Sequence, residues 1–159
     1  MGRTLTKHPH PPAPQPAPRR AARYASRGES LGLRPARTPE LIQQVRKGLP
    51  FRALRMFSTE TGFAPSMIAE AIGIPERTLA RRRNAGRLAP EESERLLRIS
   101  TVFEKAVSLF EGDVDAALNW LTTPSRALAD NTPWEYSRFE PGARDVEDLI
   151  GRMEHGVFT

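Results

Sequence analysis

Apolar residues recur along most of this chain at spacings of three and four, the period of a helix with one buried face. The clearest case is the stretch 90–112, which predicts one long helix with charged residues opposite its apolar stripe. That stripe consists of Leu96, Ile99, Phe103, Val107 and Phe110. Nowhere do Val, Ile and Thr alternate with polar residues as strands require. The pattern therefore predicts an all-α protein, a compact array of seven to nine helices.

Helix-start residues place the other elements. Thr38 is a favourable N-cap, Pro39 suits the first helical position, and Gly48 ends the helix. A second helix begins near Pro50, with core candidates Phe51, Leu54, Met56 and Phe57. Later starts are marked by capping residues, and a last helix covers about 143–154. These caps are Asp113, Thr123 before Pro124, and Thr132, which forms a capping box with Glu135.

The segment IAEAIGIPERTLARRR, residues 68–83, has the arrangement of a helix-turn-helix. Gly73 can take the positive φ that a tight turn requires, and Ala69 is small where the second helix must approach. The apolar positions expected to bury the junction are Ile68, Ile72, Ile74 and Leu79.

The second helix of this segment presents a run of basic and polar side chains. Arginine binds phosphate, or donates two hydrogen bonds to O6 and N7 of guanine in the major groove. We therefore predict DNA contact by Arg77, Thr78, Arg81, Arg82, Arg83, Asn84 and Arg87. Arg82 falls where a recognition helix normally buries an aliphatic residue. An arginine run can also be a solvated face, and this geometry also serves plain helical packing.

Charge divides the chain in two. Residues 1–37 carry eight Lys and Arg against one Glu, and residues 38–89 have a net charge of +5. Residues 90–159 carry seven basic and fourteen acidic groups, a net charge of −7. A basic front half suits a polyanion, and an acidic back half suits a protein partner.

Residues 1–37 are rich in Pro and poor in apolar bulk, so they predict a disordered arm. The expected organisation is this arm, a helix-turn-helix portion over 38–89, and a second helical domain over 90–159. His8 and His10 have no third ligand nearby, so we expect no metal site.

The chemistry available to the chain is limited. It has no Cys, which excludes disulfides and thiolate metal sites. No apolar run approaches the roughly 18 residues that a membrane span needs, and no secretory signal is present. Neither a nucleophile with a base nor a glycine-rich phosphate loop appears. We expect a cytoplasmic protein that is not an enzyme and needs no cofactor.

The sequence closes on EHGVFT, an unusual ending. His155 and Gly156 break the last helix, and Val157 and Phe158 then follow before Thr159. Last residues are usually polar and frayed, so this apolar end indicates a group that enters a partner. Arg126 and Trp134 are residue types that dominate interfaces, although each serves equally well as a structural residue.

The stretch 112–158 resembles the toxin-binding domain of the Xre-MbcA-ParS antitoxins. The shared motifs are WL.TP..AL, a second TP, and G...V..LI.R.EHGVF, in that order. The likeness covers roughly 90–159, the upstream IPERTLARRR fits the family's helix-turn-helix portion, and residues 1–37 lie outside it.

This resemblance implies a function. Antitoxins of the family pair with RES-domain toxins, which consume NAD, and hold them inactive by lodging the C-terminus at the entrance of the active site. The predicted toxin contacts are Arg126, Trp134, Glu154, His155, Gly156, Val157, Phe158 and Thr159. Many members also bind their own promoter through the helix-turn-helix, which implies repression of the operon, whereas others have lost DNA binding.

Assembly follows from the same resemblance, which implies a homodimer or a larger complex with the toxin. The stripe from Leu96 to Phe110 is wide enough to serve both a core and a second subunit. The alternative function is a helix-turn-helix transcriptional regulator whose C-terminal half only dimerises.

Overall fold

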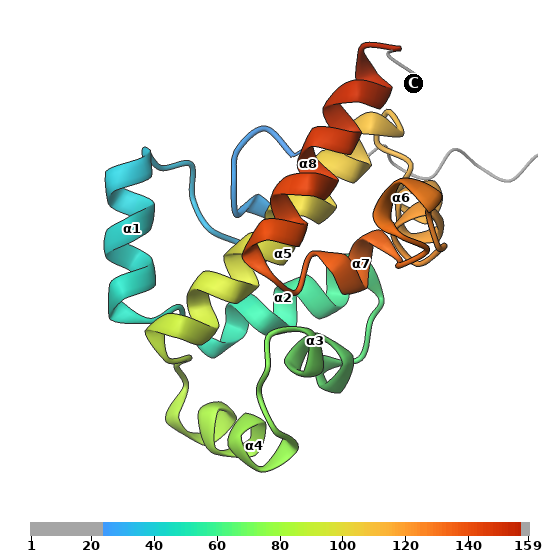
Figure 1. Cartoon of the computed structure of the whole chain (residues 1–159). Helices are drawn as coiled ribbons and strands as arrows, with labels where there is room; N and C mark the ends of the chain where they lie inside the picture. Colours follow the sequence, from blue (N-terminus) through green and yellow to red (C-terminus); the bar gives the residue numbers. More distant parts are fainter. Residues whose placement is uncertain (1–23, 157–159) are drawn as a thin grey trace, which may run out of the picture.

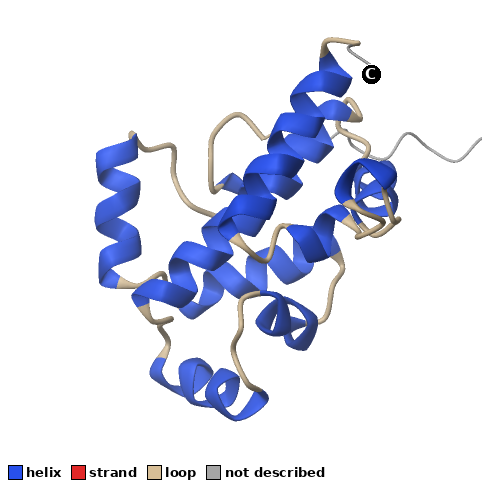
Figure 2. Cartoon of the chain, viewed as in Figure 1, coloured by secondary structure: helices blue, strands red, loops and turns tan. Residues whose placement is uncertain are grey.

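The computed structural model describes residues 24–156, and every regular element in that range is a helix, as the apolar pattern predicts (Figure 2). Eight α-helices and two short 3-10 helices follow one another along these residues. The α-helices are α1 Thr38–Lys47, α2 Phe51–Thr61, α3 Pro65–Ala71, α4 Glu76–Ala85, α5 Pro90–Leu109, α6 Val114–Leu121, α7 Pro133–Tyr136 and α8 Glu140–Glu154. The 3-10 helices are η1 Glu29–Leu31 and η2 Arg126–Leu128.

Helix α5 is the axis around which the others pack. Helices α8 and α6 lie against it, α2 crosses behind it, and α4 stands at the edge of the molecule (Figure 1). Four residues of its predicted stripe are at most 2% exposed, and Phe110 is half-buried at the helix end. The Phe103 ring is the centre of this packing, since it lies 5.5 Å from the Phe57 ring and 5.7 Å from the Tyr24 ring.

The buried residues form one continuous core rather than two. Ile68 of α3 and Ile150 of α8 belong to the same cluster, which α5 joins along its length. Helix starts follow the predicted caps at two places: Asp113 accepts a hydrogen bond from the Ala116 amide, and Thr132 accepts one from the Glu135 amide.

Four local predictions were wrong. Thr38, predicted as an N-cap, is the first residue of α1, and Arg37 occupies the N-cap position. Met56 is 42% exposed instead of buried. The residues after Thr123 form only a 3-10 turn, in which Ser125 and Asn131 pair and Ala129 and Asp130 adopt left-handed backbone conformations. The last helix begins at Glu140, three residues before the predicted start, with Pro141 in its first turn, where the missing N–H of proline costs no hydrogen bond.

The prediction of a disordered arm over 1–37 was wrong for residues 24–37. Leu31 is only 2% exposed, and η1 packs against α2 and α5. The buried carboxylate of Glu104 in α5 accepts hydrogen bonds from the Gly28 amide at 3.1 Å and the Ser30 amide at 2.9 Å. The Ser30 hydroxyl donates to it at 2.6 Å. Residues 1–23 lie outside the described part of the chain.

This anchor gives a pH-dependent contribution to stability. Burial raises the pKa of the Glu104 carboxyl, and the hydrogen bonds from Ser30 and Gly28 oppose the shift. A carboxyl whose pKa is higher in the folded state binds its proton more tightly there. Its contribution to the free energy of unfolding is therefore full below the unfolded pKa and is lost as the pH rises through the folded pKa.

Thermal melts of the wild type and Glu104→Gln across a pH series test this. We expect the wild type to gain stability relative to the variant as the pH falls, because glutamine does not titrate. Glu111→Gln, at an exposed position, is the matched control and should show no such trend. A wild-type advantage that stays constant with pH would contradict the assigned direction.

Candidate functional site

Helices α3 and α4 form the predicted helix-turn-helix. Gly73 sits at the turn with φ +72°, and the Ile74 amide closes it by donating to the Ala69 carbonyl at 2.8 Å. Pro75 then fixes the backbone in front of α4. The four apolar residues predicted at the junction are at most 5% exposed, which confirms the geometry: Ile68, Ile72, Ile74 and Leu79.

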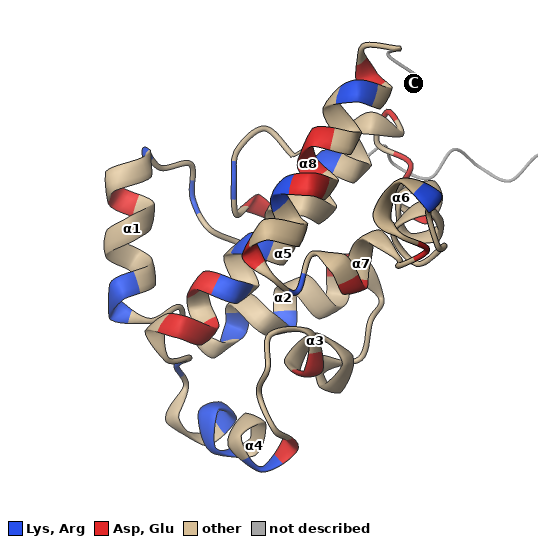
Figure 3. Ribbon diagram, viewed as in Figure 1, with Lys and Arg blue, Asp and Glu red and all other residues tan. Residues whose placement is uncertain are grey.

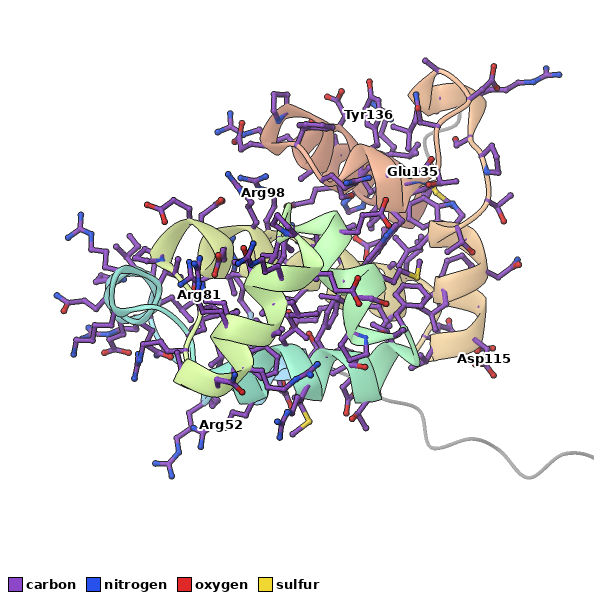
Figure 4. All side chains as sticks on the ribbon, turned by 90° about the horizontal axis from the view of Figure 1, so that it is seen from below. Arg52, Arg81, Arg98, Asp115, Glu135 and Tyr136 are labelled. Atoms are coloured by element: carbon purple, nitrogen blue, oxygen red, sulfur yellow. The ribbon has the colours of Figure 1, made fainter. Side chains whose placement is uncertain are left out.

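The outer face of α4 is basic and unobstructed by the rest of the described chain (Figures 1 and 3). Arg77, Arg81 and Asn84 are exposed at spacings of four and three, so they lie on one face, and Thr78 is half-buried beside them. Figure 4 shows this end of the molecule from below, with α4 in front and Arg81 labelled. Each of these two arginines has the donor geometry to bind O6 and N7 of a guanine.

Arg82, predicted as a DNA contact, is paired with a glutamate within the chain. Its Nε donates to both carboxylate oxygens of Glu92, at 3.1 and 2.9 Å, and this hydrogen bond raises the pKa of Arg82. Glu92 is 8% exposed and also accepts from the Ala89 amide, which caps α5. The unexpected Arg at this position is thus explained by an ion pair that joins α4 to α5. The sequence signal that could have indicated this pair is Glu92, an acidic residue in the first turn of α5.

Arg83 and Arg87 have structural neighbours but stay exposed. The Arg83 guanidinium carbon lies 5.9 Å from the centroid of the Phe51 ring. Arg87 donates from Nη1 to the carbonyls of Lys47 at 3.2 Å and Gly48 at 2.5 Å. Arg83 therefore holds its charge beside the start of α2, and Arg87 holds its charge at the end of α1.

The other predicted surface lies at the far end of α8. Glu154, His155 and Gly156 are exposed, His155 caps the end of α8, and Gly156 has a left-handed φ of +66°. The last buried residue before them is Ile150, at 2% exposure. Val157, Phe158 and Thr159 lie outside the described residues.

Comparison with known proteins assigns both surfaces to recognised domains. Residues 40–100 match the antitoxin Xre-like helix-turn-helix domain, and residues 105–156 match the antitoxin Xre/MbcA/ParS C-terminal toxin-binding domain. The chain is 39% identical over 130 residues to an Antitoxin Xre of Yersinia enterocolitica, covering 81% of this chain and 88% of that protein. It belongs to the Xre/MbcA/ParS antitoxin family.

A second relative has the same extent. An Antitoxin Xre of Photorhabdus laumondii is 35% identical over 131 residues, which is 82% of this chain and 88% of that protein. The two domain matches of this family member meet inside α5, between residues 100 and 105. The sequence predicted a domain boundary after residue 89. Because α5 belongs to one continuous core, the structure does not test that boundary, and it stays a prediction.

Within the toxin-binding domain of this antitoxin family member, Trp134 needs correction. Its side chain is 7% exposed, and its ring stacks on Phe57 at 6.3 Å and meets Phe63 edge-on at 4.9 Å. It is a core residue that holds α7 to α2, so its ring is not presented to a partner. Arg126 is exposed in η2 and remains a predicted toxin contact.

Two further findings concern residues 24–156. No helix there is both long and apolar enough to traverse a lipid bilayer. In the same range, no three His, Asp or Glu side chains come together as a possible metal site. His8 and His10 lie outside the described residues.

Proposed function

We propose that this family member is the antitoxin of a type II toxin–antitoxin pair, which silences a RES-domain toxin and represses its own operon. The observation that carries the proposal is the separation of two exposed surfaces on one rigid core. One is the basic outer face of α4, and the other is the end of α8 in the toxin-binding domain.

For the toxin, we propose that residues 154–159 enter the entrance of its NAD-consuming active site. Supporting this, Gly156 lies past the end of α8 with a positive φ that does not continue the helix, and Ile150 anchors the helix in the core four residues before Glu154. Val157 and Phe158 are the apolar groups that would fill the cleft, and the exposed Arg126 of η2 is a further candidate contact. The acidic back half of the chain suits a basic, nucleotide-binding partner.

Co-purification with the product of a neighbouring reading frame tests this half of the proposal. The neighbour should degrade NAD when alone and stop when this protein is present. The competing function is a regulator whose C-terminal half only dimerises, and it predicts no RES-type neighbour and no effect on NAD. A neighbour that consumes NAD at the same rate in both conditions would refute the antitoxin.

For DNA, we propose that Arg77 and Arg81 read bases of the operator, with Thr78 and Asn84 beside them. Replacing both arginines by Ala should weaken operator binding, by about 1–3 kcal/mol for each lost base contact. Binding to unrelated DNA should change much less, so the ratio of the two affinities should fall. Gel shifts on the gene's own upstream region and on a scrambled duplex measure both.

Arg34→Ala/Arg152→Ala is the matched control, because it removes the same charge from exposed positions away from α4. The control should leave the affinity ratio unchanged. Equal ratios for the control and for the Arg77/Arg81 variant would rule out base reading by these residues.

Assembly as a homodimer stays part of the proposal, but its basis changes. The apolar stripe of α5 is filled by the chain's own core, with Phe103 and Val107 at 0% exposure. It therefore offers no surface to a second subunit, and the dimer rests on family resemblance. Light scattering of the purified protein at high micromolar concentration tests it.

A further inference from the structure

A second group of cations lies beside α4, where the end of α1, the start of α2 and the end of α4 meet. All six of its side chains are exposed, and the stretches 46–55 and 83–87 that supply them contain no Asp or Glu. We call this group the flanking basic cluster. Its members are Arg46, Lys47, Arg52, Arg55, Arg83 and Arg87. The base contacts proposed above use none of them, and the sequence pattern singled out only Arg83 and Arg87.

Backbone hydrogen bonds bring these residues together from distant parts of the chain. The Phe51 amide donates to the Gly86 carbonyl, and the Leu88 amide donates to the Leu49 carbonyl, both at 2.9 Å. The approach is so close that a Cβ on Gly48 would lie 2.2 Å from the Leu88 carbonyl oxygen. The end of α4 is therefore fixed against the start of α2.

Side chains complete the junction. Arg87 donates to two carbonyls at the end of α1, those of Lys47 and Gly48. The Arg55 and Arg83 guanidinium carbons lie 5.5 and 5.9 Å from the centroid of the same Phe51 ring. Three of the six side chains are thus held by contacts at the junction, and the backbone segments that carry all six are joined there.

The charges of the cluster are not neutralised within the described chain. In residues 24–156 none of the six forms an ion pair, whereas Arg82, Arg98 and Arg138 each pair with a glutamate. Like charges held together repel one another and raise the free energy of the free protein. A bound polyanion would offset that cost.

We propose that the flanking basic cluster binds the phosphate backbone of the duplex DNA whose bases α4 reads. This rests on the proposed operator binding. Figure 3 shows Lys and Arg on α4, on the lower end of α1 and on α2, and Figure 4 shows Arg52 and Arg81 in the view onto α4. The six charges are spread over three elements, so they suit a row of phosphates rather than one small anion. Contacts of this kind position a recognition helix without reading sequence.

The test is the salt dependence of DNA binding by Arg52→Gln/Arg55→Gln. Each lost phosphate contact should reduce the slope of log affinity against log salt by about 0.9, and should weaken binding about eightfold at 0.1 M salt. The own upstream duplex and a scrambled duplex of equal length should weaken alike, so their ratio should not change. The melting temperature should stay the same or rise, because repulsion is relieved.

Arg34→Gln/Arg152→Gln is the matched control, and it should keep the wild-type slope. Arg46→Gln/Lys47→Gln, on α1, is a second pair that should also lower the slope, and it does not touch the Phe51 ring. Slopes for both cluster pairs equal to that of the control would overturn the proposal. In that case, a loss of preference for the upstream duplex by Arg77→Ala/Arg81→Ala would still support operator binding by α4 without the flanking basic cluster.

Two other results would also contradict phosphate binding by the flanking basic cluster. One is weaker binding of single-stranded RNA with unchanged binding of duplex DNA. The other is a fall in melting temperature that parallels the loss of affinity in both cluster pairs, because that would show a structural role. A wild type that binds neither duplex at any salt concentration would refute the cluster and the operator proposal together.

Discussion

A chain that carries Phe103→Asp is expected not to fold. Phe103 is 0% exposed, and its ring contacts those of Phe57 and Tyr24. Removing a buried Phe ring costs about 3–5 kcal/mol, and an unpaired buried carboxylate adds several more. The total is comparable to the whole stability of a typical domain, about 5–15 kcal/mol.

Circular dichroism and thermal melting of the variant measure this directly. Phe139→Asp is the matched control, since Phe139 is 70% exposed and the same substitution there adds its charge in water. The control should keep the helical signal and melt at or above the wild-type temperature, because Phe139 occupies the N-cap position of α8 and Asp is a favourable N-cap. A Phe103→Asp protein that melts like the control would contradict the position of this ring in the core.

The same residue shows what sequence alone could and could not establish. The three- and four-residue spacing correctly placed Phe103 on a buried stripe, because the period of a helix is a local property. It could not say what the stripe packs against, and a second subunit was a reasonable candidate. The N-terminal segment answers part of that question, since Tyr24 covers one side of the ring.

That segment was misjudged for a physical reason. Composition averages over a window, and the Pro-rich residues before it hid a single buried leucine, Leu31. Order there depends on Glu104, which lies more than 70 positions away and offers its carboxylate to the Gly28 and Ser30 amides. A pattern of neighbouring residues cannot reveal a contact between residues so far apart in the sequence.

The candidate site divides in the same way. The turn at Gly73 and its four buried apolar residues were predictable, because glycine's backbone freedom and apolar spacing are local. Which arginines stay available was not predictable, since Arg82 and its partner Glu92 lie on different helices. The burial of Trp134 was not predictable either. Its residue type is common at interfaces, but its packing partners Phe57 and Phe63 lie far away in the sequence.

Deleting residues 154–159 is expected to abolish protection against the toxin while the fold and operator binding survive. None of the three described residues in this segment is buried, and the last core residue before it is Ile150. The deletion therefore removes no side chain from the described core. What it does remove is the apolar pair Val157 and Phe158, which we propose enters the active-site entrance.

The size of the effect follows from the burial of one aromatic ring. Fully burying a Phe is worth roughly 1.5–3 kcal/mol, and truncating a central aromatic anchor commonly costs about 2 kcal/mol or more. Phe158→Ala alone should then weaken toxin binding by about 30-fold or more, since 1.4 kcal/mol corresponds to a factor of ten. Substituting Glu154 or His155 shows whether polar contacts contribute beside it.

The competing explanation is that Phe158 packs on this protein's own last helix, and two measurements on one sample separate the two. If the ring packs on α8, the truncated protein should melt at a lower temperature, and neutralisation should fail because the domain has loosened. If the ring enters the toxin, the melting temperature and operator affinity should match the wild type while NAD is consumed in the presence of the toxin. A truncated protein that melts normally and still protects NAD would show that residues 154–159 do not block the toxin.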